Sequence, residues 1–431
     1  MTLRRSFWGV LFLLLISGLV SYFTPLISGI PTPIFFTRLV YLSVLLIAIG
    51  YGWAYVSTRG ITLLREARVL RHQVGQVFEE RFKLVNRLPF ARLWVEIRDD
   101  SQLPGNSGSR VLSLIGARQQ RSYIAYTVLN RRGSFQLGPT KLVSGDPFGL
   151  FTFTQVQPVE HTLVVLPYIV NLRDFPSPVG MFPGGRAIRR KAHEVTPQAA
   201  GVREYAPGDA LRRIHWPTSA RKDRLMTKEF DQDPQADVWI FLDAYAPVHF
   251  SQVDDLSQSP KVDQLWMWQR STEVKLPPDS FEYAVSAAGS IASFYIKQGR
   301  TVGFVSAGNV LMVHSPERGE RQLTKILETL TFLRPDGDLP LTGLIEAQAP
   351  SLPRASTVVL ITSSTHESLE LGIDYLIMRS LRPVLVSVDV RSFGGNLGGD
   401  EIISRMKLRN IPILTLSKDQ DLNQALESER Y

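Results

Sequence analysis

Two uncharged apolar runs near the start of the sequence constrain the fold more than any other feature. Residues 7–23 carry no charge over roughly 17 positions, which is the lower limit for a helix that crosses a bilayer. Residues 39–56 form a run of similar length that ends with Tyr51, Trp53 and Tyr55, the aromatic types that gather at membrane interfaces. The two runs predict a transmembrane helical hairpin.

Basic residues lie outside this hairpin rather than in its link, which carries only Arg38. The flanking arginines are Arg4, Arg5, Arg59, Arg65, Arg68 and Arg71. The positive-inside rule therefore predicts a two-pass protein with both ends and all soluble domains in the cytoplasm. A cleaved signal peptide is the alternative for the first run, but no small-x-small cleavage site follows it and a second apolar run comes at once.

The net charge of +8 indicates an anionic partner. Because many of the arginines adjoin the apolar runs, we expect them to face the lipid bilayer rather than nucleic acid. No zinc-finger or RNA-recognition signature is present, and no nucleic-acid partner is expected. The sequence has no cysteine, which excludes disulfides, thiolate metal sites and a cysteine nucleophile.

After a hairpin over residues 1–59, residues 60–170 have the pattern of an all-β sandwich. Short, often alternating runs are separated by turn clusters rich in glycine and proline. The predicted strands are 78–86, 92–97, 111–115, 122–129 and 163–167.

Residues 171–235 read as an irregular connector that ends in a charge-dense stretch, residues 201–230. Large apolar residues lie among its charges, so we expect it to fold. Asp209 is a good N-cap for a short helix, Pro217 is expected to break that helix, and Thr218 or Ser219 to cap a second one. Residues 225–230 alternate as a strand does.

Residues 236–431 alternate apolar strands with amphipathic helices, which predicts a doubly wound α/β sheet. The predicted strands are 238–242, 301–305, 310–313, 357–361, 384–388 and 411–416. The predicted helices are 281–297, 322–333, 369–378, 402–408 and one in the tail.

The charge-dense stretch resembles the signature of bacterial domain-of-unknown-function family number 58. The pattern is met by Gly201, Arg203, Tyr205, Pro207, Gly208, Asp209, Arg212, Ile214, Trp216, Ala220 and Arg221. Two further stretches are similar to elements of the family: R-R-G-S-F-Q-L-G-P at 131–139 and D-P-F-G-L-F at 146–151. In the second, we expect the carboxylate of Asp146 to bond the backbone of the following turn. The resemblance implies a bacterial inner-membrane location, a von Willebrand factor A-like α/β domain, and association with MoxR-type AAA+ ATPases and other membrane proteins.

A metal-binding von Willebrand factor A domain has D-x-S-x-S after its first strand, and here only Asp243 of that motif is present. Tyr245 and Pro247 replace the two serines. One carboxylate with scattered hydroxyls supplies too little charge for Mg²⁺. We therefore interpret Asp243 as a degenerate metal site, expect no metal or other cofactor, and expect Asp243 to cap a backbone turn or pair with an arginine.

No nucleophile elbow, Walker loop or His-Glu-x-x-His motif is present. The candidate site is thus the signature itself: Arg203, Glu204, Tyr205, Asp209, Arg212, Arg213, His215, Trp216 and Arg221. Its arginines outnumber its carboxylates, which suits carboxylate or phosphate binding better than acid–base work. Three interpretations stay open, namely a structural ion-pair network, a partner-docking site and a catalytic site.

A second docking candidate is the long segment 247–278, which holds Trp266 and Trp268. Exposed aromatic clusters suit binding surfaces, although the same residues could fill the crevice beside Asp243. The sequence as a whole favours a membrane-anchored, non-enzymatic scaffold or adaptor in protein assembly, working with a MoxR-type ATPase. The alternative is a hydrolase acting on peptide or envelope precursors through the 201–230 signature, with His215 and Asp209 as its reactive groups. Adhesion through the α/β domain is disfavoured by the lost serines.

Overall fold

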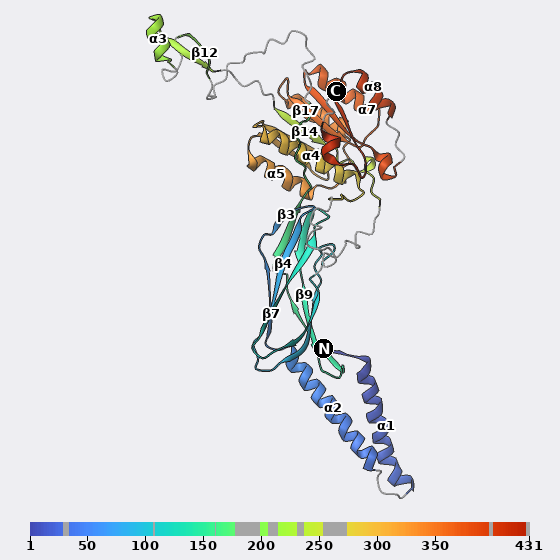
Figure 1. The fold of residues 1–431 in the computed structure, drawn as a ribbon. Coiled ribbons are helices and arrows are strands. Elements are labelled where there is room, and N and C mark those ends of the chain that lie inside the picture. Colours follow the sequence, from blue (N-terminus) through green and yellow to red (C-terminus); the bar gives the residue numbers. More distant parts are fainter. Residues whose placement is uncertain are drawn as a thin grey trace. The chain divides into compact units, whose positions relative to one another are not determined.

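The computed structural model describes residues 1–28, 34–106, 108–159, 161–176, 199–205, 214–230, 237–252, 274–395 and 400–427. The chain forms two compact units (Figure 1). The first comprises Met1–Val170, Phe250–Gly289 and Leu327–Leu333. The second comprises Asn171–His249, Ser290–Ile326 and Arg334–Tyr431.

The two apolar runs form helices α1 (Arg5–Ser28) and α2 (Ile34–Thr58). The stretches Arg5–Phe23 and Ile34–Thr58 are long and apolar enough to cross a membrane. Both helices extend beyond the predicted runs. The expectation of two N-terminal apolar helices is confirmed.

A short strand ahead of α1 ties the start of the chain to the sheet region that follows α2. Strand β1 (Thr2–Leu3) pairs antiparallel with β10 (Phe151–Gln157), with Thr2 opposite Thr152 and Leu3 opposite Phe151. The sequence did not predict this strand. It lengthens one sheet at its edge and brings the chain back beside residues about 150 positions later.

The region after α2 is rich in sheet, as expected. Its strands are β2 (Ile61–Ala67), β3 (Arg71–Gln73), β4 (Val77–Asn86), β5 (Arg92–Asp99), β6 (Arg110–Ile115), β7 (Gln120–Val128), β8 (Gly133–Leu137), β9 (Thr140–Gly145), β10 and β11 (His161–Leu166). They form sheets in the orders β1-β10-β9-β5-β6, β2-β4-β7 and β3-β11-β8. The first two sheets share a core that includes Leu63, Phe82, Val95, Ile97 and Leu142. The apolar residues of the alternating pattern therefore face this core.

Helix α2 joins this β-region without a linker. Only Arg59 and Gly60 separate Thr58 of α2 from Ile61 of β2. Arg92 donates through Nη2 to the main-chain oxygen of Arg59 at 2.8 Å. The buried residues at this junction are Ala54, Leu150 and Phe151, and the rings of Tyr51 and Phe151 are 5.7 Å apart. We call this packed connection the α2–β2 joint.

The second unit contains a six-stranded sheet in the order β16-β15-β14-β17-β18-β19. Its strands are β14 (Val238–Leu242), β15 (Val302–Ala307), β16 (Leu311–Glu317), β17 (Thr357–Thr362), β18 (Arg382–Val388) and β19 (Ile413–Leu416). All pairs are parallel except β15–β16, which is antiparallel. A mixed α/β sheet is thus confirmed.

Helices alternate with these strands much as predicted. They are α4 (Ser280–Lys297), α5 (Glu320–Phe332), α6 (Leu341–Gln348), α7 (Ser368–Met378), α8 (Asp400–Leu408) and α9 (Leu422–Leu426). Helices α6, α7 and α8 bury side chains such as Leu344, Ile373 and Met406 with Phe241 and Leu360 of the sheet. Helix α6 was not predicted from the sequence.

Candidate functional site

Asp243 lies at the carboxyl edge of the six-stranded sheet, directly after β14. Asp243 is buried, with 1% of its surface exposed. Its carboxylate Oδ1 accepts a hydrogen bond from Tyr245 N at 3.0 Å, and Oδ2 accepts one from Thr362 Oγ1 at 2.6 Å. Both carboxylate oxygens are therefore engaged by donors of this chain, one in a backbone turn and one at the end of the neighbouring strand β17.

Burial raises the pKa of Asp243 to about 6, against the hydrogen bonds from Thr362 and Tyr245, which lower it. Desolvation disfavours the charged form and is the larger effect. The carboxyl group therefore changes its charge close to neutral pH, although its side chain faces protein rather than solvent.

His249 completes this edge, and the sequence did not single it out. Its Nε2 lies 3.0 Å from the main-chain oxygen of Asp243, and its Nδ1 lies 3.3 Å from Ser363 Oγ. Because a carbonyl oxygen only accepts, Nε2 carries the hydrogen, and in the neutral ring Nδ1 accepts from Ser363. A serine beside a histidine is also the arrangement of a nucleophile and its base. Ser363 is 0% exposed, which favours a structural role for this pair.

Gly337 brings a third loop to the same edge. Its N donates to Ala244 O at 3.0 Å, and Ala246 N donates to its oxygen at 3.0 Å. A Cβ at Gly337 would lie 2.2 Å from Ala307 O, so only glycine fits this approach. This loop was not predicted from the sequence, and the Asp336-Gly337-Asp338 segment was the sequence signal that could have predicted it. Within the described ranges, no three histidine, cysteine or acidic side chains are grouped as a metal site.

The signature contains a small hairpin with a helix. Strands β12 (Ala199–Glu204) and β13 (Met226–Phe230) pair antiparallel, and α3 (Trp216–Lys222) precedes β13. The strand predicted at 225–230 is therefore present. Ser219 is buried and accepts from Met226 N at 2.9 Å, which fastens the helix to the strand.

The second short helix is present as α3, but the cap assigned to Thr218 or Ser219 is wrong, and the helix expected after Asp209 lies outside the described residues. His215 is the N-cap of α3, and its Nδ1 accepts from Thr218 N at 3.3 Å. Pro217 lies in the first turn, where proline's missing N–H costs no helical hydrogen bond. The imidazole Nδ1 also lies 2.7 Å from Thr218 Oγ1, so this nitrogen is used in local structure.

The other signature residues are described only in part. Glu204 forms an ion pair with Arg224, and both side chains are more than half exposed, so this pair adds little stability. Trp216 is 66% exposed. Tyr205 donates its N–H to Leu225 O at 2.9 Å, and Arg221 is exposed. The side chain of Arg203 lies outside the described part of the chain, as do Asp209, Arg212, Arg213, Trp266 and Trp268. A structural network, a docking site and a catalytic site all remain predictions for the signature.

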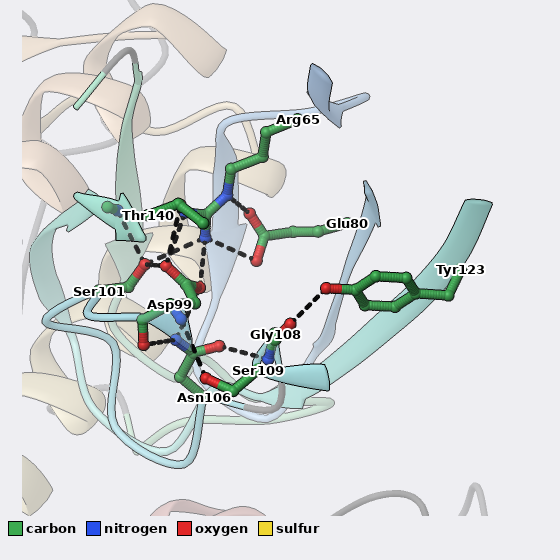
Figure 2. Close-up of polar contacts among 10 residues, drawn as sticks. Arg65, Glu80, Asp99, Ser101, Asn106, Gly108, Ser109, Tyr123 and Thr140 are labelled. Atoms are coloured by element: carbon green, nitrogen blue, oxygen red, sulfur yellow. Dashed lines mark hydrogen bonds and ion pairs between the residues drawn. The ribbon is translucent and has the colours of Figure 1, made fainter. Parts of the chain in front are cut away.

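A buried ionic cluster in the first unit was not foreseen (Figure 2). Arg65 of β2 donates through Nε and Nη2 to Glu80 of β4, at 2.7 and 3.0 Å. It also donates through Nη1 and Nη2 to both oxygens of Asp99, each at 2.9 Å. The side chains of Arg65, Glu80 and Asp99 are 8%, 1% and 0% exposed. This cluster ties three strands from both sheets of the shared core.

Neutral donors and acceptors complete the Arg65 cluster. Asn106 donates to Asp99 Oδ2 at 2.7 Å, and Ser101 donates to Asp99 Oδ1 at 2.7 Å (Figure 2). Burial raises the pKa of Glu80, although its hydrogen bonds with Arg65 oppose that shift. Arg65 is thus enclosed in protein, which corrects the expectation that it faces lipid with the other flanking arginines.

Comparisons with known proteins support the resemblance drawn from the signature. Residues 201–260 match the family model described as "Protein of unknown function DUF58". A curated relative, the "Uncharacterized protein YeaD" of Bacillus subtilis (strain 168), is 25% identical over 303 residues. That alignment covers 67% of this chain and 67% of the relative.

Proposed function

We propose that this chain, a DUF58-family protein, is a membrane-anchored, non-enzymatic scaffold or adaptor in protein assembly. In this proposal α1 and α2 cross a bacterial inner membrane, and the β-region and α/β sheet lie in the cytoplasm. The family resemblance suggests a MoxR-type AAA+ ATPase as the partner, together with other membrane proteins. The α/β sheet is proposed to be von Willebrand factor A-like, since its antiparallel edge strand and β-α alternation fit that expectation.

The observation that carries the proposal is the α2–β2 joint. Soluble domains that are only kept near a membrane are usually attached by exposed, flexible linkers. Here two residues separate α2 from β2, and Ala54 of the helix is fully buried beside Leu150 and Phe151. A β-region packed directly onto a membrane helix has a fixed distance and direction from the bilayer, which suits a protein that positions others.

Strand β1 supports the two-pass arrangement. It precedes α1, whereas β2 follows α2, and both strands belong to the first unit. Two helices that start and finish in one compact unit must enter and leave a membrane on the same face. Arg4, Arg5 and Arg59 then lie on that face, and the positive-inside rule favours the cytoplasm.

The geometry of the carboxyl edge also favours binding over catalysis. Loops at this edge of an α/β sheet are the usual ligand-binding region. The carboxylate of Asp243 is occupied by Tyr245 N and Thr362, and Ser363 is buried beside His249. These groups hold the loops in place, so we propose that the surface formed by the loops recognises a partner protein.

The test is purification of the full-length chain from native membranes after mild cross-linking. We expect an AAA+ ATPase to be enriched, with ATP hydrolysis in the eluate. Insertion of a flexible Gly-Ser segment between Arg59 and Gly60 should reduce that recovery because it uncouples the β-region from the bilayer. The matched control is the same insertion after Gly319, an open turn between β16 and α5. Wild-type eluates without an ATPase would contradict the partner, and equal recovery from both insertions would contradict the positioning role.

A further inference from the structure

The turn that joins β9 to β10, residues 146–151, satisfies its own backbone donors. The carboxylate of Asp146 accepts from Phe148 N at 2.9 Å, Leu150 N at 2.9 Å and Phe151 N at 2.6 Å. Gly149 N donates to the main-chain oxygen of Asp146 at 3.3 Å. Pro147 has no N–H. Every backbone N–H that follows Asp146 in this turn therefore has a partner within the turn, or does not exist.

A turn on an aqueous surface does not need this arrangement because water satisfies exposed N–H groups. A turn that enters a bilayer does need it, since each unsatisfied group in hydrocarbon costs several kcal/mol. For its N–H groups, the tip thus meets a condition that an environment poor in water imposes.

The same turn lies beside the starting point of α1. Arg4 N donates to Leu150 O at 3.1 Å, and the rings of Phe7 and Phe151 are 5.3 Å apart. Because β1 runs antiparallel to β10, it runs toward the turn, and α1 continues from there. Figure 1 shows the N-terminus and the start of α1 next to this end of the β-region.

Contacts with α2 place the turn along the second helix. A Cβ on Gly50 would lie 3.3 Å from Leu150 Cδ1 and 3.6 Å from Asp146 Oδ2. Helix α2 has 25 residues, or about 37 Å at a rise of 1.5 Å per residue. A hydrocarbon core of about 30 Å takes up only about 20 of them. Tyr51, Trp53 and Tyr55, the aromatic types that gather at membrane interfaces, follow Gly50 directly, so Gly50 and the turn lie at the edge of the core.

The tip exposes apolar side chains at this level. Phe148 is 50% exposed, and the neighbouring Pro147 is also exposed. Arg4 and Arg5, both exposed, lie at the start of α1 close by. Exposed aromatic and cationic side chains at one end of the β-region match the boundary between acyl chains and anionic headgroups.

We propose that the 146–151 turn is a lipid-contacting element that inserts Phe148 into the boundary between headgroups and acyl chains. This inference rests on the proposed membrane crossing by α1 and α2. The carboxylate of Asp146 holds the tip in one conformation by accepting hydrogen bonds from the backbone N–H groups of the tip. The turn then gives the β-region a third contact with the bilayer, beside the two helices.

The test uses the absence of cysteine from the sequence. Single-cysteine variants of the full-length chain are spin-labelled in nanodiscs of phosphatidylcholine and phosphatidylglycerol. Collision rates with oxygen, which concentrates in lipid, are compared with those of a water-soluble nickel complex. The positions are Phe148→Cys, Phe12→Cys in α1 (65% exposed) and Val69→Cys (51% exposed). Val69 follows β2, whose last residue, Ala67, lies about 20 Å along the strand from Ile61 at 3.3 Å per residue.

We expect the oxygen-to-nickel ratio at position 148 to be several-fold higher than at 69 and lower than at 12. A ratio at 148 equal to that at 69, with a high ratio at 12, would overturn the lipid contact and leave the membrane crossing intact. A low ratio at 12 would overturn both. If Phe148→Cys lowers the melting temperature, Pro147→Cys takes its place with the same expected result.

Discussion

Replacing Arg65 with methionine should destabilise the β-region more than any other change in the ionic cluster. The side chains of Arg65, Glu80 and Asp99 are 8%, 1% and 0% exposed. Methionine keeps the length and apolar character of the arginine stem but removes the charge and the donors. Two buried carboxylates are then left without a cation. Removal of one partner from a buried ion pair costs about 3–5 kcal/mol in free energy of unfolding.

Glu80→Gln is the informative counterpart. The wild-type cluster carries one positive and two negative charges, a sum of −1, whereas Arg65 with Asp99 alone sums to zero. Glutamine also resembles the protonated form of Glu80, which burial already favours by raising the pKa of that carboxyl. The variant loses one of the two hydrogen bonds from Arg65, worth about 1 kcal/mol. Arg65→Met should therefore cost at least 2 kcal/mol more than Glu80→Gln, as an order-of-magnitude difference.

Amide hydrogen exchange of β4 and β7 in the full-length protein measures this directly because it reports local opening free energies. A loss of 3–5 kcal/mol corresponds to exchange roughly 10²- to 10⁴-fold faster, and 1 kcal/mol to less than about tenfold. Arg98→Met is the matched control, since Arg98 pairs with Glu96 at the surface with 52% of its side chain exposed. Equal acceleration by Arg65→Met and Glu80→Gln would refute the electrostatic reasoning.

Three further predictions concern other parts of the chain. The pKa of Asp243 is raised from 3.8 to about 6, so its contribution to stability is full below pH 3.8 and is lost as pH rises through 6. Protection of β14 and β17 amides should therefore fall as the pH rises from 3.8 to about 6, and level off above that, more in the wild type than in Asp243→Asn; equal slopes would contradict this. Asp146→Ala leaves three backbone donors without their acceptor, at about 1–3 kcal/mol each, and should lower the melting temperature, whereas exposed Asp100→Ala should not. Reporters fused after Tyr431 and after Arg71 should both report cytoplasm, and a periplasmic signal from either would contradict the two-pass arrangement.

The parts of the fold that were predictable are those with long periodic patterns. The apolar runs became α1 and α2, and the strand–helix alternation after residue 236 became the six-stranded sheet. In such segments the spacing of apolar residues predicts helix or strand, because every second or every third to fourth side chain must face a core. The turn role expected for Asp146 is likewise seen, since its carboxylate bonds Phe148 N.

The unpredicted features depend on residues far apart in the sequence. Arg65 looks like one more flanking cation, and only the pairing of β2 with β4 and the position of β5 bring Glu80 and Asp99 to it. Strand β1 has two residues and no pattern of its own. Its existence is decided by β10, a partner that local sequence cannot identify.

The candidate site was predicted only in part. Asp243 was singled out, and the backbone turn expected of it is present through Tyr245 N. His249 was missed because its hydrogen bonds go to a main-chain oxygen and to Ser363, which is 114 positions away. The cap of α3 was misassigned because the helix was expected to begin after Pro217, although proline is tolerated in a first turn.

The pairing of Thr2 with Thr152 also sets an order of events during synthesis. These residues are 150 positions apart, so at roughly 5–20 residues per second the ribosome makes β10 about 8–30 s after β1. Both apolar helices are complete long before then. Until then β1 has no strand to pair with. The edge of this sheet therefore cannot be completed before β10 is made, however early the other parts of the first unit fold.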